Sequence, residues 1–219
     1  MTEPARYRFD ASWREVVTLV DGTAAVLRLV RAEDKALLRA GFDRLSPGSR
    51  YLRFFAAKQE LTEAEVAQLT EIDGVDHVAL GAVRQGPDGG WEGLGVARFV
   101  RDPSVPDMAE AAVTVTDPAQ GNGLGRLLLA RLAEAARERG IMRFVGEFLA
   151  TNAQVRQLIA EACPDARLTA RGEVVRVEVP LPDAGAAGPS LQRLLRQAAG
   201  GRLQLRLRHL LLKDSERTL

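Results

Sequence analysis

The amino-acid sequence predicts a mixed α/β (α+β) domain, built on a mostly antiparallel sheet and followed by a C-terminal extension. Short β-rich runs joined by tight turns come first, which is typical of antiparallel strands. Two later strands are each followed by a helix, and the last stretch of the chain changes in composition and charge. This order excludes an all-α bundle and a repeat architecture.

The composition is that of a globular protein. The chain has 219 residues, of which 46% are apolar and 27% charged, so a disordered, collagen-like or disulfide-scaffold protein is excluded. Its single cysteine, Cys163, excludes an intramolecular disulfide and a thiolate zinc cluster. We therefore expect no metal site and a reducing, cytoplasmic location. No run approaches the roughly 20 apolar residues that a membrane span requires, so we expect no membrane segment.

The first half of the sequence predicts a strand, three helices and a β-hairpin. In chain order these are a strand at Ala25–Val30, helices that begin near Arg31, Ser46 and Thr62, and strands at His77–Arg84 and Leu94–Val100. Pro47 lies in the first turn of its helix, where a missing N–H costs nothing. Thr62 and Glu65 have the spacing of a reciprocal capping box. The glycine-rich segment 86–90 predicts the turn of the hairpin.

The second half predicts the two strand–helix units. In order, the elements are a strand at Glu110–Thr116, a helix from Leu124 to Gly140, a strand at Met142–Leu149, a helix at Asn152–Ala162 and a hairpin-like segment at Leu168–Val179. The apolar residues of the first of these helices repeat at helical spacing, and Gly140 is typical of a helix C-terminus.

The chain beyond Leu181 differs from the rest. Residues 182–189 are rich in Pro, Gly and Ala and predict a linker. Residues 181–219 carry seven Lys/Arg against three Asp/Glu, whereas residues 1–180 carry 23 against 26. Leucines then alternate with Gln and Arg, a pattern ambiguous between strand and helix. We expect a domain over 1–181 and a basic, leucine-rich extension over 182–219.

The apolar face of the extension must be covered by something. Packing against the domain or against a second copy of the chain, as in a homodimer, is the favoured interpretation. A nucleic-acid-binding tail is the less favoured one, because the interleaved leucines describe a half-buried element more simply and the net charge of the whole chain is only +1.

The stretch Gln120-Gly121-Asn122-Gly123-Leu124-Gly125-Arg126 is the motif that indicates chemistry. A glycine-rich turn that runs into a helix exposes successive N–H groups, allows a phosphate close to the main chain and adds the helix dipole. A pyrophosphate is the ligand that such a loop favours, and a plain tight turn is the alternative. The loop lacks the Lys-Ser/Thr of an ATP site and the early βαβ unit of an NAD site.

This motif resembles the Q/R-x-x-G-x-G/A loop of the GNAT superfamily of acetyltransferases, which binds the pyrophosphate of acetyl-CoA. The resemblance implies a central V-shaped cleft where two strands splay, flanked by helices, with the backbone of Glu110–Thr116 along the pantetheine arm. The implied CoA-binding residues are Val113, Val115, Gln120, Gly121, Asn122, Gly123, Gly125, Arg126 and Asn152. For Asn152, a simple helix N-cap is the alternative.

Segments 45–55 and 95–103 are similar to the GNAT domains of bacterial Pat-type protein-lysine acetyltransferases. That resemblance implies Glu110 as the general base, for which the alternative is a solvated strand-edge carboxylate. It implies direct attack by a primary amine in a ternary complex and favours a protein lysine as acceptor. His77 is a candidate auxiliary base, with a structural role preferred. Ile159 stands where many members have a tyrosine acid, so a catalytically weak acyl-CoA-binding regulatory module is the alternative function.

Overall fold

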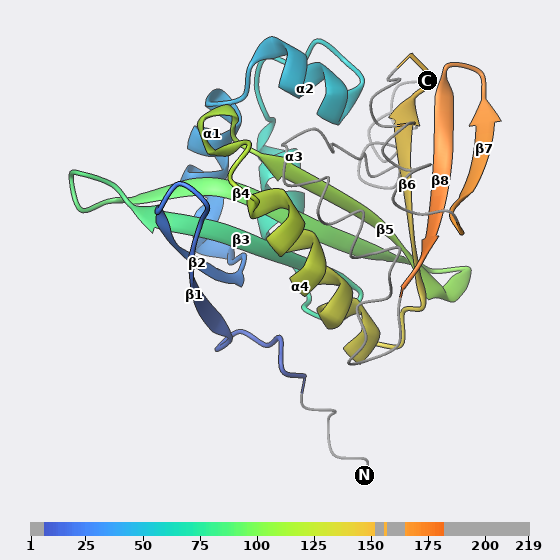
Figure 1. Cartoon of the computed structure of the whole chain (residues 1–219), viewed down its shortest axis with the longest axis horizontal. Coiled ribbons are helices and arrows are strands. Elements are labelled where there is room, and N and C mark those ends of the chain that lie inside the picture. Colours follow the sequence, from blue (N-terminus) through green and yellow to red (C-terminus); the bar gives the residue numbers. More distant parts are fainter. Residues whose placement is uncertain (1–6, 152–155, 157–164, 182–219) are drawn as a thin grey trace.

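A computed structural model describes residues 7–151, 156 and 165–181 of the chain. Its centre is an eight-stranded sheet in the order β1-β2-β3-β4-β5-β6-β8-β7 (Figure 1). The strands are Arg14–Thr18 (β1), Ala24–Leu29 (β2), His77–Gln85 (β3), Trp91–Asp102 (β4), Val105–Val115 (β5), Arg143–Leu149 (β6), Arg167–Arg171 (β7) and Val174–Pro180 (β8). The helices are Lys35–Asp43 (α1), Pro47–Phe54 (α2), Glu63–Thr70 (α3) and Leu124–Glu138 (α4). Neighbouring strands are antiparallel except β5 and β6, which are parallel.

The mixed, mostly antiparallel sheet flanked by helices confirms the predicted fold class. The expected caps form: Ser46 Oγ accepts a hydrogen bond from Ser49 N at 3.2 Å, and Thr62 and Glu65 make the reciprocal capping box of α3. One strand was not predicted. Strand β1 is an edge strand without a buried residue, so it lacks the apolar alternation that reveals a strand in sequence.

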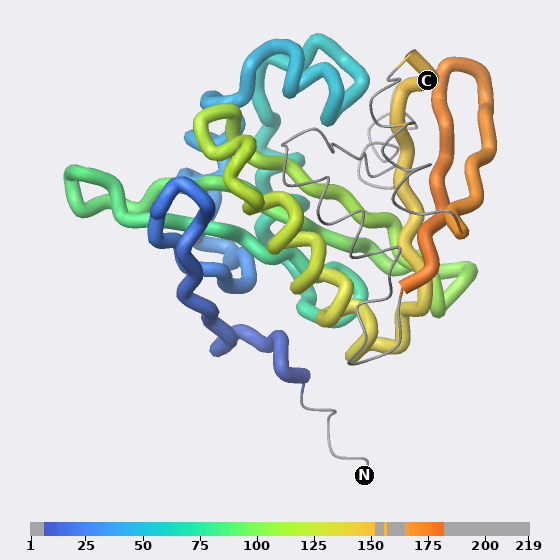
Figure 2. The backbone as a smooth tube through the Cα atoms, viewed as in Figure 1, coloured from blue at the N-terminus to red at the C-terminus, as the bar shows by residue number. Residues whose placement is uncertain are grey.

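Two expected segments cannot be compared with the structure. The helix expected at Asn152–Ala162 lies outside the described residues apart from residue 156, and so does the extension at 182–219. The hairpin-like segment at Leu168–Val179 is the β7–β8 hairpin, which turns at Gly172. Strands β1 and β7 form the two opposite edges of the sheet (Figure 2).

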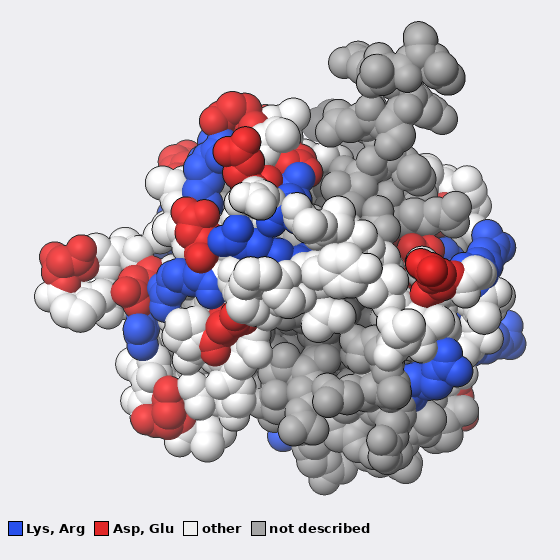
Figure 3. Space-filling model, turned by 90° about the horizontal axis from the view of Figure 1, so that it is seen from above, with Lys and Arg blue, Asp and Glu red and all other residues white. Residues whose placement is uncertain are grey.

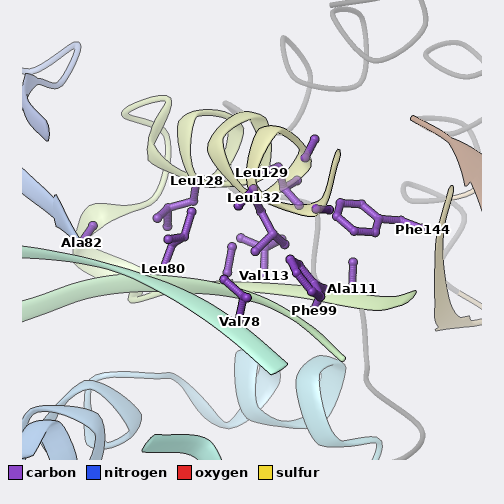
Figure 4. Packing of buried hydrophobic residues seen from close by; sticks show 14 of the residues in the cluster. Val78, Leu80, Ala82, Phe99, Ala111, Val113, Leu128, Leu129, Leu132 and Phe144 are labelled. Carbon is purple, nitrogen blue, oxygen red and sulfur yellow. The ribbon is translucent and has the colours of Figure 1, made fainter. Parts of the chain in front are cut away.

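One face of the sheet packs against α4 and forms the main core. Alternate residues of the central strands point to this face, among them Leu80 of β3, Phe99 of β4 and Val113 of β5, and all three are buried. They meet Leu128 and Leu132 of α4, which are fully buried between helix and sheet (Figure 4). Because this contact holds β5 and α4 together, it also determines where the loop between them lies.

The opposite face of the sheet is covered by α1, α2 and α3. A second cluster of buried apolar residues joins these helices, namely Phe42, Leu45, Leu61, Val66 and Leu69. Between this cluster and the sheet, the buried guanidinium of Arg98 on β4 donates from Nη1 to Leu69 O at 3.0 Å and contacts His77 Nε2 at 3.3 Å. Burial, with the charge of Arg53 as a second cause, lowers the pKa of Arg98 to about 9, so Arg98 remains the donor at neutral pH. Nε2 of His77 is then the acceptor, and its Nδ1 carries the proton.

On the described surface, acidic and basic side chains lie interspersed over the face shown in Figure 3. Within the described residues, no helix is long and apolar enough to cross a membrane. The same residues contain no cluster of three or more His, Cys, Asp or Glu side chains that could hold a metal ion.

Replacing Gly95 by alanine tests the packing of α4 on the sheet. A Cβ at Gly95 would lie 2.9 Å from Thr114 O and 3.3 Å from Leu128 Cδ1, so we expect Gly95→Ala to lower the free energy of unfolding by about 1–3 kcal/mol through overpacking. Gly41→Ala in α1 is the control, because a Cβ there meets nothing within 4 Å. It should raise stability by up to about 1 kcal/mol through helix propensity. Urea unfolding measures both, and equal shifts would contradict the packing argument.

Replacing His77 tests whether the fold holds its imidazole in the neutral form. Burial of the imidazole, and secondly the positive charge of Arg98, lower the pKa of His77 from 6.5 to about 4. The negative charge of Asp73 opposes this shift. The unfolded chain therefore takes up this proton first as the pH falls. Its contribution is complete above about pH 6.5 and is lost as the pH falls towards 4, by about 3 kcal/mol. Between pH 6.5 and 4, the free energy of unfolding of His77→Gln should therefore fall by about 3 kcal/mol less than that of the wild type. Identical pH dependence in the two proteins would show that His77 is not held neutral by the fold.

Candidate active site

Strands β5 and β6 separate in the middle of the sheet. Their parallel pairing comprises three residue pairs and ends at Glu110 and Val145. Beyond that point β5 remains paired with β4 as far as Val115, and β6 remains paired with β8 as far as Leu149. In Figure 1 the two ribbons diverge from their paired end. The outer backbone edge of β5 beyond Glu110 therefore has no partner strand among the described residues.

The backbone N–H groups of Val113 and Val115 point into this separation. Thr116 N donates to Leu94 O of β4 at 2.9 Å, and N–H groups of consecutive residues in an extended strand face opposite sides. Those of Val113 and Val115 therefore face away from β4, towards the side that β6 has left. The carbonyl of Val115 faces the same way and accepts a hydrogen bond from Gln120 Nε2 at 3.2 Å.

The loop after β5 has the geometry of an anion site. Gly121 and Gly123 have φ values of 81° and 79°, which are left-handed conformations that favour glycine. Gly123 is the N-cap of α4, and no described side chain caps the helix there. The first N–H groups of α4 are therefore available to a ligand, and the helix dipole adds positive potential at the same place.

Two side-chain contacts anchor this loop. Asp117 accepts hydrogen bonds from Gln120 Nε2 at 2.8 Å, from Ser49 Oγ at 2.6 Å and from Ser46 N at 2.7 Å, so it links the loop to the start of α2. Burial is the largest single influence on the pKa of Asp117 and raises it, but the hydrogen bonds together outweigh burial, so the pKa is lowered. On the other side, Asn122 Nδ2 donates to Asp21 Oδ2 in the β1–β2 turn at 2.7 Å.

Glu110 lies at the point where the two strands part. It is opposite Val100 in the β4–β5 ladder and next to Val145 of β6. Its side chain alternates with those of the α4-side core and points to the face that α1–α3 cover. The residue is 5% exposed, so the alternative of a solvated edge carboxylate does not describe its surroundings. His77 lies on the same face, but its Nε2 contacts Arg98.

The structure brings most of the predicted residues to one region. Glu110, Val113 and Val115 follow one another along β5, and Gln120 to Arg126 form the loop and first turn of α4. Asn152 lies outside the described residues. Sequence reasoning missed the anchoring role of Asp117: Asp117-Pro118 indicated only the end of a strand, and nothing in the sequence connects it with Ser46 and Ser49 across some 70 residues.

Comparison with known proteins places the chain in a family. Residues 53–163 match the model of the acetyltransferase (GNAT) family. A protein of Pseudomonas aeruginosa named as an acetyltransferase is 32% identical over 143 residues, which cover 65% of this chain and 76% of that protein. Acetyltransferase Pat of Mycolicibacterium smegmatis is 34% identical over 114 residues, which cover 49% of this chain and 31% of that protein.

Solved structures similar to this chain include acetyltransferases of the same family. The GNAT domain of S. lividans PAT superimposes with a TM-score of 0.67 and 32% sequence identity, covering 79% of this chain and 99% of that domain. A cAMP-binding acyltransferase from Mycobacterium smegmatis gives a TM-score of 0.53 at 26% identity, covering 84% of this chain and 55% of that protein. The chain therefore belongs to the GNAT family of acetyltransferases, and it is an acyltransferase whose donor is acetyl-CoA.

Proposed function

We propose that the protein transfers the acetyl group of acetyl-CoA to a primary amine by direct attack in a ternary complex, with Glu110 as general base. The observation that carries this proposal is the end of β5–β6 pairing at Glu110. Where this pairing ends, β5 carries the carboxylate of Glu110 and then the outward-facing N–H groups of Val113 and Val115. The glycine loop follows directly after the strand.

Each part of this arrangement has a role in the proposed reaction. The N–H groups of Val113 and Val115 would hydrogen-bond the pantetheine arm, and a backbone donor near the thioester would stabilise the charge that develops on its carbonyl oxygen. The loop from Gln120 to Arg126 would hold the pyrophosphate through the N–H groups at the start of α4. Asn152 would contact the CoA arm, as the family resemblance implies.

The role of Glu110 follows from the chemistry of the acceptor. An ammonium group cannot attack a thioester, because its lone pair is occupied by a proton. A carboxylate beside the splayed strands can take that proton directly or through a water. The resemblance to Pat-type enzymes favours a protein lysine as the acceptor, since two of the relatives named above are Pat proteins.

The remaining expectations are also proposals. A catalytic domain over 1–181 agrees in size with the S. lividans domain, which covers 79% of this chain. The extension 182–219 would then be an addition that packs on the domain or forms a homodimer. The relatives come from bacteria, which supports a bacterial protein, and the single cysteine supports the cytoplasm.

Glu110→Gln tests the proposed base. We expect acetyl transfer at neutral pH to fall by about 10²- to 10⁴-fold, because an amide cannot accept the proton, while the Kd for acetyl-CoA stays within about twofold of the wild type. The matched control is Glu147→Gln, which changes a glutamate of the neighbouring strand β6 and should leave the rate unchanged. Release of free CoA in the presence of a cell lysate measures the rate, and mass spectrometry identifies the acetylated amines.

Two results would contradict the proposal. Wild-type turnover in Glu110→Gln would exclude Glu110 as the base. Tight binding of acetyl-CoA by the wild type without any acetylated product in the lysate would instead favour the regulatory binding module.

Gly123→Ala tests the loop as the pyrophosphate site. Alanine at a φ of 79° is strained, and relief of the strain would turn the N–H groups of the loop away from the ligand. We expect acetyl-CoA to bind at least about tenfold more weakly. Gly172→Ala is the control, because it introduces a similar strain at a φ of 59° in the β7–β8 turn. Both variants should lose about 1 kcal/mol of stability, but calorimetry should find weaker binding only for Gly123→Ala. Equal affinities in the two variants would argue against the loop.

A further inference from the structure

A cavity of about 100 Å³ lies between the sheet and the helices on the face opposite α4. Its walls are mainly apolar and come from α1, α2, α3 and the segment between α2 and α3, with Leu37, Phe42, Phe54, Leu61 and Leu69 among them. Its floor is formed by β2 to β5. A single water needs about 10–15 Å³ of such volume, so the cavity has room for a small molecule of several heavy atoms.

The buried guanidinium of Arg98 lines this cavity. The residue is 2% exposed, and its Nη1 is engaged by Leu69 O and His77 Nε2. Among the described residues, its Nε and Nη2 have no hydrogen-bond acceptor. These two nitrogens form the edge of the guanidinium that matches a carboxylate with two parallel hydrogen bonds.

The charge of Arg98 has no acidic partner among the described residues. Arg28, which also lines the cavity, forms a two-bonded ion pair with Asp34, with both distances 2.6 Å. The polar neighbour of Arg98 is instead a second cation, Arg53, which binds Thr114 Oγ1 at 3.0 Å and also lines the cavity. A buried charge without a counter-charge costs several kcal/mol. The guanidinium of Arg98 therefore provides a place in this apolar cavity where an anion would be stabilised.

The shape of the site selects the kind of anion. Phosphate and sulfate are hydrated on all sides and would lose that hydration against the apolar walls. A carboxylate with a short aliphatic body satisfies both ends: its oxygens meet the guanidinium, and its carbons contact the leucine and phenylalanine side chains. We propose that the cavity binds a small aliphatic monocarboxylate, held by Arg98.

The position of the cavity relates it to the reaction. Arg98 is opposite Ala112 in the β4–β5 ladder, and Glu110 is two residues from Ala112 along β5 and on the same face of the sheet. The carboxylate belongs either to the acceptor amine itself or to a separate acid that acts as an effector. Both sources have the same chemistry at Arg98, and activity distinguishes them.

The binding test uses the full chain and isothermal titration calorimetry with butyrate. We expect butyrate to bind in the millimolar range or tighter, and butyramide and inorganic phosphate to bind at least about tenfold more weakly. Arg98→Met should weaken butyrate by at least about tenfold, and Arg98→Lys should weaken it less because the charge remains. Arg84→Met is the matched control: Arg84 is a solvent-accessible arginine of β3, paired with Glu92 at 2.7 Å, and its replacement should leave binding unchanged.

Activity assays then separate the two sources. Acetylation of 4-aminobutyrate, with a KM that Arg98→Met raises at least about tenfold, would assign the cavity to the acceptor. Altered acetylation of an unrelated amine by butyrate, which itself is not acetylated, would assign it to an effector. The proposal is overturned if wild-type protein does not bind butyrate, or if butyramide binds equally well. The comparison of acid with amide uses only the wild type, so it decides the matter even if the Arg98 variants fail to fold.

Discussion

The arrangement of the site depends on one constraint: strand β5 pairs continuously with β4 from Ala109 to Val115, but its pairing with β6 ends at Glu110. A strand in this position has three separate surfaces. One set of side chains packs on α4, and the alternate set points to the side that α1–α3 cover, where Thr114 lines the cavity. The free backbone edge faces the space between the diverging strands. Because side chains alternate between the two faces along β5, one residue can pack against α4 while the next points towards α1–α3.

The packing of α4 places the loop that we propose for pyrophosphate binding beside this free edge. Leu128 and Leu132 lie fully buried against the strands, and Gly95 is needed where β4 meets the helix closely. The N-terminus of α4 is therefore held at the open end of β5, where it can add its N–H groups to those of the strand. Asp117 and Asp21 hold the intervening loop from two sides through Gln120 and Asn122. The loop is in this way connected to α2 and to the β1–β2 turn.

Features that depend on neighbouring residues in the chain were predictable from sequence. The capping box at Thr62, the hairpin turn before β4 and the glycine loop each reside in a few consecutive residues, so their local chemistry determines them. Strand β1 was not predictable, since its sequence, Arg-Glu-Val-Val-Thr, does not alternate apolar with polar residues. The contacts of Asp117 and Arg98 join segments that are distant in sequence, and their partners can be identified only once the sheet is assembled.

Arg98 differs from Arg28 and Glu65, two other charged residues on this side of the sheet, in having no oppositely charged partner among the described residues. Arg28 has Asp34, and Glu65 combines a capping role with an ion pair to Lys58 at 2.7 Å. In both cases the cost of burial is offset within the described chain. A methionine at position 98 could fill a similar volume without that cost, so packing alone does not account for an arginine there. Departures from local consistency are expected where a protein binds something, and a ligand carboxylate is the group that would complete this one.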